Sequence, residues 1–236
     1  MGIYLKKTFK NGATIGVWQI VESEEEMLNL LGADARDEME EDLEEINLNK
    51  SQKLRTQQLA VRLLVNDLFG QVMHIGHHEN GSPYLENDGT HISISHTDNF
   101  AAVILHPTEE VGIDIESIKR NFTAVEKRAL SEEEREDLIE ADAEDAEEVE
   151  ERNTQLAIYW CAKEAIYKRM DRFQVDFSED IELDKFNVHE EGEIEAVFKY
   201  PESEQVIDDG EELPNEEEFN LEYEVFEDHV MVWLVG

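Results

Sequence analysis

Residues 91–116, HISISHTDNFAAVILHPTEEVGIDIE, decide the fold because they contain three strand patterns in succession. Polar and apolar residues alternate through 91–96, with the isoleucines on one face and the serines on the other, as in a half-buried strand. Two further apolar runs follow at 100–105 and 111–116, separated by a turn at Pro107. We therefore expect three strands along this stretch.

Helical patterns lie on both sides of these strands. Residues 52–69 have the apolar spacing of a helix and end at Gly70, a residue typical of helix C-termini. Residues 154–170 form a second pattern of the same kind. The C-terminal segments EIEAVFKY, FNLEYEVF and HVMVWLVG indicate antiparallel strands.

Each half of the chain therefore predicts helix plus sheet, and we expect an α+β fold in two lobes. The expected domains are residues 1–106 and residues 107–236. The second domain contains an acidic stretch near 132–151 that is poor in large apolar residues, and we interpret this stretch as an insertion.

The chain is strongly acidic. Its 236 residues include 20 Lys and Arg against 59 Asp and Glu, a formal net charge of -39. This charge argues against binding to nucleic acid or to an anionic membrane surface. A single cysteine, Cys161, excludes an intramolecular disulfide framework, and the sequence contains neither a secretory signal pattern nor a membrane-spanning apolar run. We expect a cytoplasmic protein that binds neither nucleic acid nor membranes.

The scarce basic residues gather in three short windows. Twelve of the 20 Lys and Arg lie in them, which suggests that the cations hold an anion, although pairing with neighbouring carboxylates would explain them as well. The windows contain Lys50, Lys53, Arg55 and Arg62; Lys119, Arg120, Lys127 and Arg128; and Lys163, Lys168, Arg169 and Arg172.

The sequence VGIDIE places two carboxylates, Asp114 and Glu116, on the same face of a predicted strand. Two such groups repel each other unless a cation lies between them, and Mg²⁺ prefers hard oxygen ligands of this kind. A solvated acidic strand edge would have the same pattern. The residues alone leave both interpretations open.

The sequence WCAKEAIYK places Glu164 and Lys168 four residues apart on one helix face, in the same row as Trp160. Lys163 projects about 100° away from Glu164. The pair could be an ordinary ion pair, or Glu164 could bind a metal while Lys168 contacts a phosphate. The spacing does not distinguish these interpretations.

Ser95 and His96 end the first predicted strand, where a hydroxyl and an imidazole could both donate to phosphate oxygens. A structural role is the alternative for His96. The cluster His74, His77 and His78 has the spacing of transition-metal ligands, but no carboxylate or cysteine sits at a supporting position nearby. We therefore predict no metal site in that cluster.

Four motifs between residues 81 and 168 occur in a specific order: G-x-P, a strand ending in Ser-His, G-I-D-I-E, and W-x-x-K-E-A-x-x-K. In this order they resemble the 4′-phosphopantetheinyl transferase superfamily, in the two-lobed form that activates peptide and polyketide synthases. The resemblance runs from about residue 50 to about residue 175 and continues more loosely to the C-terminus.

The resemblance implies two similar α+β lobes related by a pseudo-twofold, with the active site in the cleft between them. It implies the activity of a holo-[acyl-carrier-protein] synthase, which transfers the 4′-phosphopantetheine of coenzyme A to a serine of an apo carrier protein and releases 3′,5′-ADP. The carrier would be an acyl, peptidyl or aryl carrier domain. A monomer is expected, because a two-lobed chain supplies its own site.

Site residues are also implied by the resemblance, position by position. Asp114, Glu116 and Glu164 would bind Mg²⁺, with Mn²⁺ as an alternative. Lys168 would contact the pyrophosphate, and Glu164, or as second choice Lys168, would take the proton of the serine. The remaining contacts to coenzyme A would come from Arg62, Ser95, His96, Lys163, Lys53 and Arg55.

The chain departs from the family at Ser82, where a basic residue usually contacts a phosphate. Carrier proteins are acidic, so a partner with a net charge of -39 must dock through an apolar patch or a local basic patch. The candidates for a basic patch are the cations that follow Glu116, namely Lys119, Arg120, Lys127 and Arg128.

Two other functions would use the same residues. One is a coenzyme A-binding or carrier-binding module without catalysis. The other is a metal-dependent phosphohydrolase that acts on coenzyme A or nucleotides and needs no carrier protein.

Overall fold

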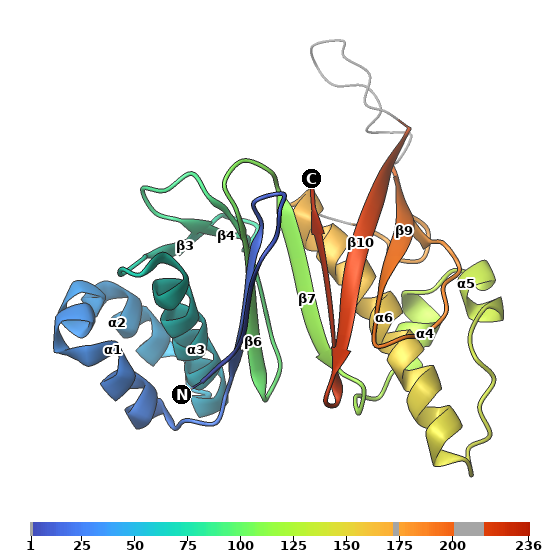
Figure 1. Ribbon diagram of the computed structural model, residues 1–236, viewed down its shortest axis with the longest axis horizontal. Coiled ribbons are helices and arrows are strands. Elements are labelled where there is room, and N and C mark those ends of the chain that lie inside the picture. Colours follow the sequence, from blue (N-terminus) through green and yellow to red (C-terminus); the bar gives the residue numbers. More distant parts are fainter. Residues whose placement is uncertain (1, 172–174, 201–214) are drawn as a thin grey trace. The chain divides into compact units, whose positions relative to one another are not determined.

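The computed structural model describes residues 2–171, 175–200 and 215–236 (Figure 1). Helices and antiparallel sheets occur in both halves of the chain, which confirms the predicted α+β class. No helix in the described residues is long and apolar enough to cross a membrane.

The chain divides into two compact units. The first is Met1–Ile115 with Val235, and the second is Glu116–Leu234 with Gly236. The predicted domain boundary at 106/107 and the pseudo-twofold relation between lobes stay predictions.

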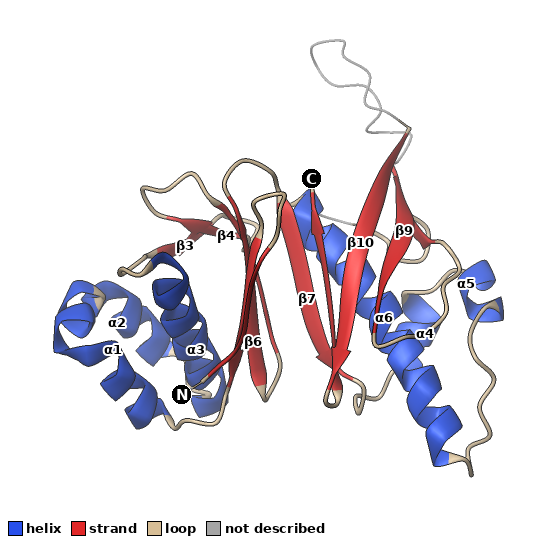
Figure 2. Ribbon diagram, in the orientation of Figure 1, coloured by secondary structure: helices blue, strands red, loops and turns tan. Residues whose placement is uncertain are grey.

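The first unit is a four-stranded antiparallel sheet in the order β1-β2-β6-β5, covered on one face by helices (Figure 2). Helix α3 packs on β2 and β6, while α1 and α2 pack on α3. A hairpin of β3 and β4 completes the unit. The elements are β1 (Ile3–Thr8), β2 (Thr14–Gln19), α1 (Glu24–Glu38), α2 (Glu40–Leu48), α3 (Gln52–Phe69), β3 (Ile75–His77), β4 (Pro83–Leu85), β5 (His91–His96) and β6 (Phe100–His106).

Helix α3 confirms the predicted helix over 52–69. The hydroxyl of Ser51 caps its N-terminus by accepting a hydrogen bond from the Leu54 N–H. Gly70 ends the helix in the left-handed region, at φ 69°, where a residue without Cβ is favoured. The buried face of α3 contributes Leu59 and Leu64 to the core of the first unit.

Strand β5 is buried on both faces, so the expectation of a half-buried strand was wrong. Ile92 and Ile94 pack in or against the core, as expected. On the opposite face, Ser93 and Ser95 are also buried, and their hydroxyls accept hydrogen bonds from the backbone of the strand at 111–117. Serine can line a buried face at low cost where such backbone donors satisfy it.

The second unit contains the sheet β7-β11-β10-β9-β8, whose edge strand β7 includes the division between the units. Helix α6 packs on the inner part of this sheet, and both contribute to one apolar cluster. The three C-terminal strands confirm the antiparallel prediction. The elements are β7 (Val111–Ser117), α4 (Thr123–Arg128), α5 (Glu132–Glu136), α6 (Ala146–Met170), β8 (Ile181–Leu183), β9 (Glu191–Lys199), β10 (Glu216–Phe226) and β11 (His229–Val235).

Helices form much of the acidic stretch at 132–151. Ser131 and Glu134 make a capping box at the start of α5. Helix α6 begins at Ala146, earlier than the predicted start at 154, because the Asp145 carboxylate caps it and acidic residues near a helix N-terminus interact favourably with the helix dipole. The stretch therefore belongs to the helical framework of the second unit.

Candidate active site

Asp114 lies on β7 and is fixed within the first unit. Its carboxylate is buried and accepts a 2.7 Å hydrogen bond from the hydroxyl of Ser95 on β5. The same hydroxyl accepts from the backbone N–H of Ile115 at 3.2 Å. Ser95 therefore orients Asp114, because the Ser95 hydroxyl donates its proton to the Asp114 carboxylate. His96, the next residue, is exposed at the end of β5.

Glu116 follows on the same strand and is half-buried. One carboxylate oxygen accepts from the Ser117 N–H at 2.9 Å, and the other pairs with the guanidinium of Arg120. The Arg120 guanidinium also lies 4.9 Å from the centre of the Trp160 ring, a cation–π contact. Arg120 thus connects Glu116 with helix α6.

Helix α6 presents Trp160, Glu164 and Lys168 along one row, and all three are half-buried. The residues between them, such as Ala162 and Ala165, are buried in the core of the second unit. This division follows from helical spacing, which returns to the same face every three to four residues. A half-buried acidic and basic row is suited to contact with a charged ligand.

Oxygen donors for a divalent cation are present, but they fall in both units: Asp114 in the first, Glu116 and Glu164 in the second. In the described part of the chain, no three His, Cys, Asp or Glu side chains are grouped closely enough to hold a metal ion. The donor chemistry fits Mg²⁺, which takes carboxylate oxygens. The shared metal site stays a prediction.

Arg62 lies in the interior of the first unit, at 4 % exposure, and not on a surface where it could face a nucleotide. Its guanidinium pairs with the buried carboxylate of Asp42 at 3.2 Å. Asp42 also contacts the Nδ1 atom of His74 at 2.7 Å. The charge of Arg62 is already paired in the core, and its contact with coenzyme A stays a prediction.

Asp42 was missed at the sequence level because it lies 20 residues before Arg62 and 32 before His74, on a different helix. No local pattern joins residues that far apart.

Arg55 and Lys53, near the start of α3, also pair with carboxylates. Arg55 makes two hydrogen bonds of 2.9 Å to the two oxygens of Glu24, and a third to the Asn49 carbonyl at 2.8 Å. Lys53 pairs with Asp98 at the surface. For these two residues the structure shows the carboxylate pairing that the sequence left open.

Lys163 is fully buried in the second unit, and its contact with coenzyme A stays a prediction as well. Its ammonium group donates to Glu134 and to two backbone carbonyls. Arg172, from the same window of cations, lies outside the described residues.

A pocket of about 400 Å³ lies in the second unit beside α4. Aromatic and aliphatic side chains form much of its lining, with two guanidinium groups and the carboxylate of Asp176. The exposed cations Lys127 and Arg128 on α4 have no ion-pair partner among the described residues. The lining residues are Arg120, Ala124, Val125, Arg128, Ala129, Trp160, Val175, Asp176 and Phe177.

Comparison with known proteins assigns a family to this region. Residues 110–221 match the family model described as the 4′-phosphopantetheinyl transferase superfamily. The match begins just before β7 and ends inside β10, so it includes Asp114, Glu116, Glu164 and Lys168. No curated protein matches the chain. The resemblance drawn from the motifs is therefore confirmed at the level of the superfamily.

Proposed function

We propose that this chain, whose residues 110–221 carry the pattern of the 4′-phosphopantetheinyl transferase superfamily, transfers 4′-phosphopantetheine from coenzyme A to a serine of an apo carrier protein. The family match supports phosphopantetheine transfer in general. The observation that carries the finer proposal is the retention of all four charged residues of the motifs, on β7 and α6, within the matched segment. A binding module that had lost catalysis would not need all four.

In the proposed reaction the serine oxygen attacks the phosphorus that bears pantetheine. The bond from this phosphorus to the bridging pyrophosphate oxygen breaks, and 3′,5′-ADP leaves. Glu164 is our first choice to take the serine proton, because a carboxylate can accept it directly. Lys168 is the second choice, since an ammonium group must first lose its own proton. Positioning of the reactants and stabilisation of the transition-state charge supply most of the rate enhancement, as in other phosphoryl transfers.

Asp114, Glu116 and Glu164 would hold Mg²⁺ in this proposal, or Mn²⁺ in its place. The metal, when bound, offsets negative charge on the pyrophosphate. The hydrogen bond from Ser95 supports the role of Asp114, because it fixes the direction of a buried carboxylate without neutralising it.

Among the predicted contacts to coenzyme A we keep Lys168 and His96, because both belong to the motifs that resemble the superfamily. Lys168 is half-buried on the same row as Glu164, and His96 is exposed at the end of β5. Lys53 is exposed as well, but a phosphate would have to replace Asp98 as its partner. Ser82 is occupied locally, since its hydroxyl donates to Asn80 at 2.9 Å.

We assign carrier docking to α4 and the adjacent pocket. Lys127 and Arg128 offer positive charge that no described carboxylate pairs with, in a strongly acidic chain and next to the apolar lining with Trp160 and Phe177. An acidic carrier would be attracted by the cations and would bury its apolar side chains in the pocket.

Reversing the two charges with Lys127→Glu and Arg128→Glu is expected to raise KM for the carrier about tenfold at low salt, with KM for coenzyme A unchanged. Steady-state kinetics with each substrate varied in turn measures both constants. The matched control, Lys10→Glu with Lys185→Glu, changes the net charge by the same amount at other exposed sites. Equal effects of the two double variants would mean that net charge, and not this surface, governs docking.

The function itself is tested by incubating the protein with coenzyme A, Mg²⁺ and several apo carrier proteins, followed by intact mass spectrometry of the carriers. We expect a carrier to gain one phosphopantetheine, and EDTA to abolish the gain. Coenzyme A bound without any transfer would favour the binding module. Cleavage of coenzyme A without transfer would favour the phosphohydrolase.

A further inference from the structure

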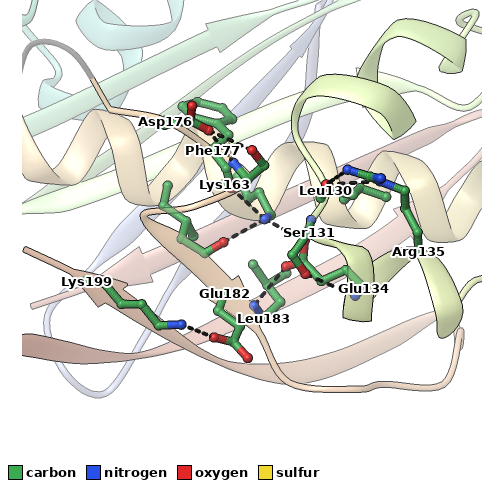
Figure 3. A network of polar contacts seen from close by, with 12 residues as sticks. Leu130, Ser131, Glu134, Arg135, Lys163, Asp176, Phe177, Glu182, Leu183 and Lys199 are labelled. Atoms are coloured by element: carbon green, nitrogen blue, oxygen red, sulfur yellow. Dashed lines mark hydrogen bonds and ion pairs between the residues drawn. The ribbon is translucent and has the colours of Figure 1, made fainter. Parts of the chain in front are cut away.

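Lys163 on α6 carries a charged side chain in the interior of the second unit, with an exposure of 0 %. Its ammonium group donates to Glu134 Oε2 at 2.7 Å, to the Phe177 carbonyl at 2.7 Å and to the Ile181 carbonyl at 2.6 Å (Figure 3). An ammonium group has three donors. All three are used inside the unit, and none is left for a ligand.

Glu134 is the anionic centre of the same network and is 3 % exposed. Its Oε2 also accepts from the Ser131 N–H at 2.8 Å, and its Oε1 accepts from the Leu183 N–H at 3.0 Å. One ion pair therefore connects α5, α6, the segment around Phe177 and strand β8. Burial lowers the pKa of Lys163, and the charge of Glu134 offsets part of that shift.

The network lies next to two parts of the proposed transferase, namely Glu164 on α6 and the docking pocket. Lys163 directly precedes Glu164, so the direction of Lys163 into the core fixes the rotation of α6 that turns Glu164 outward. Phe177, whose carbonyl Lys163 holds, has its ring 5.7 Å from the rings of both Trp160 and Tyr167. Trp160 and Phe177 line the docking pocket.

Stability alone does not account for such a pair. Replacing a buried ion pair by apolar residues of similar volume often leaves stability unchanged or raises it, because desolvation offsets the attraction. What an apolar pair cannot supply is direction, since its contacts have no preferred angle. Three hydrogen bonds donated by one nitrogen atom hold α6 against three other segments: α5, the segment around Phe177, and β8.

We propose that Lys163, held by Glu134, is a positioning residue that sets the direction of Glu164 and the Phe177 wall of the docking pocket. The inference rests on the proposed function, because it gives Lys163 a role in phosphopantetheine transfer without contact to either substrate.

The test compares one broken pair with one replaced pair. Lys163→Met alone leaves the Glu134 charge buried, and Tm is expected to fall by roughly 10 °C. The double variant Lys163→Met with Glu134→Leu removes both charges, and Tm is expected to return to within a few degrees of the wild type. Its kcat is nevertheless expected to be about tenfold lower, with affinity for Mn²⁺, measured by calorimetry with coenzyme A present, reduced by a similar factor.

Glu134→Gln provides a second variant that keeps side-chain volume and one oxygen acceptor for Lys163. It places an amide group near the Leu183 N–H, so the network must shift while the core stays filled. We expect a folded protein with kcat lowered about fivefold and KM for coenzyme A unchanged. If the double variant does not fold, the kcat of Glu134→Gln tests the inference in its place.

The control is Lys185→Met, which removes a surface cation paired with Asp137 in the same unit and should change none of these values. Folded variants with the kcat, carrier KM and Mn²⁺ affinity of the wild type would overturn the inference and leave the proposed function intact. A wild-type protein that neither transfers phosphopantetheine nor binds Mn²⁺ would overturn the proposed function, and the inference with it.

Discussion

Asp114→Asn is expected to lower kcat/KM for carrier modification by at least about 100-fold while changing Tm by only a few degrees. Asparagine has nearly the same size as aspartate, and its carbonyl oxygen can still accept the hydrogen bond from Ser95. The change therefore removes the negative charge of a buried carboxylate and little else. A hard, anionic oxygen is the ligand that Mg²⁺ requires at this position.

The measurement is the rate at which an apo carrier gains phosphopantetheine, followed by intact mass spectrometry, together with thermal unfolding of the same samples. Asp67→Asn is a suitable control, because Asp67 is an exposed carboxylate paired with Lys6 in the same unit. That variant should transfer at the wild-type rate. Transfer by Asp114→Asn within about threefold of the wild type would remove Asp114 from the metal site.

Arg62→Met is expected to lower Tm by roughly 10 °C without changing KM for coenzyme A. The side chains of Arg62 and Asp42 are 5 % and 8 % exposed, so solvent screens their interaction little. Removing the arginine leaves a buried carboxylate with His74 as its remaining partner. Breaking a buried pair in this way costs about 3–5 kcal/mol, of which each kcal/mol lowers Tm by about 2–4 °C in a chain of this size.

Differential scanning calorimetry and coenzyme A kinetics distinguish a structural role of Arg62 in the core from a contact with coenzyme A. Removing both charges with Arg62→Met and Asp42→Leu should recover most of the lost Tm, because no unpaired charge then remains in the core. Lys6→Met, which breaks an exposed pair, should have little effect. A raised KM for coenzyme A at an unchanged Tm would instead return Arg62 to the nucleotide site.

The sequence determined those elements whose pattern is local. The apolar period of α3 and the glycine at its end can be read without any neighbour, and Gly70 takes the left-handed conformation that such a helix end favours. The alternation in β9 and β10 and the apolar run in β11 are equally local. By contrast, β1, β2, α1 and α2 were not predicted, because elements with weak apolar periodicity depend on the surfaces they pack against.

The motifs around Asp114 and Glu164 could likewise be read from the sequence, because strand and helix spacing decide which side chains share a face. The superfamily match over residues 110–221 agrees with that reading. The capping box of Ser131 and Glu134 is a local contact seen in the structure, whereas Glu134 also pairs with Lys163, 29 residues away, and no local pattern joins those two.

Which cations pair with carboxylates inside the core depends on contacts between residues far apart in the sequence. In the sequence, Arg62 and Lys163 look like the other scarce basic residues, and both were assigned to coenzyme A. In the fold, Asp42 lies 20 residues from Arg62 and Glu134 lies 29 residues from Lys163, yet each carboxylate meets its cation in a buried core. Burial makes an unpaired charge so costly that these partners must be supplied within the fold. Lys127 and Arg128 stay exposed, because water solvates their charges and no such partner is required.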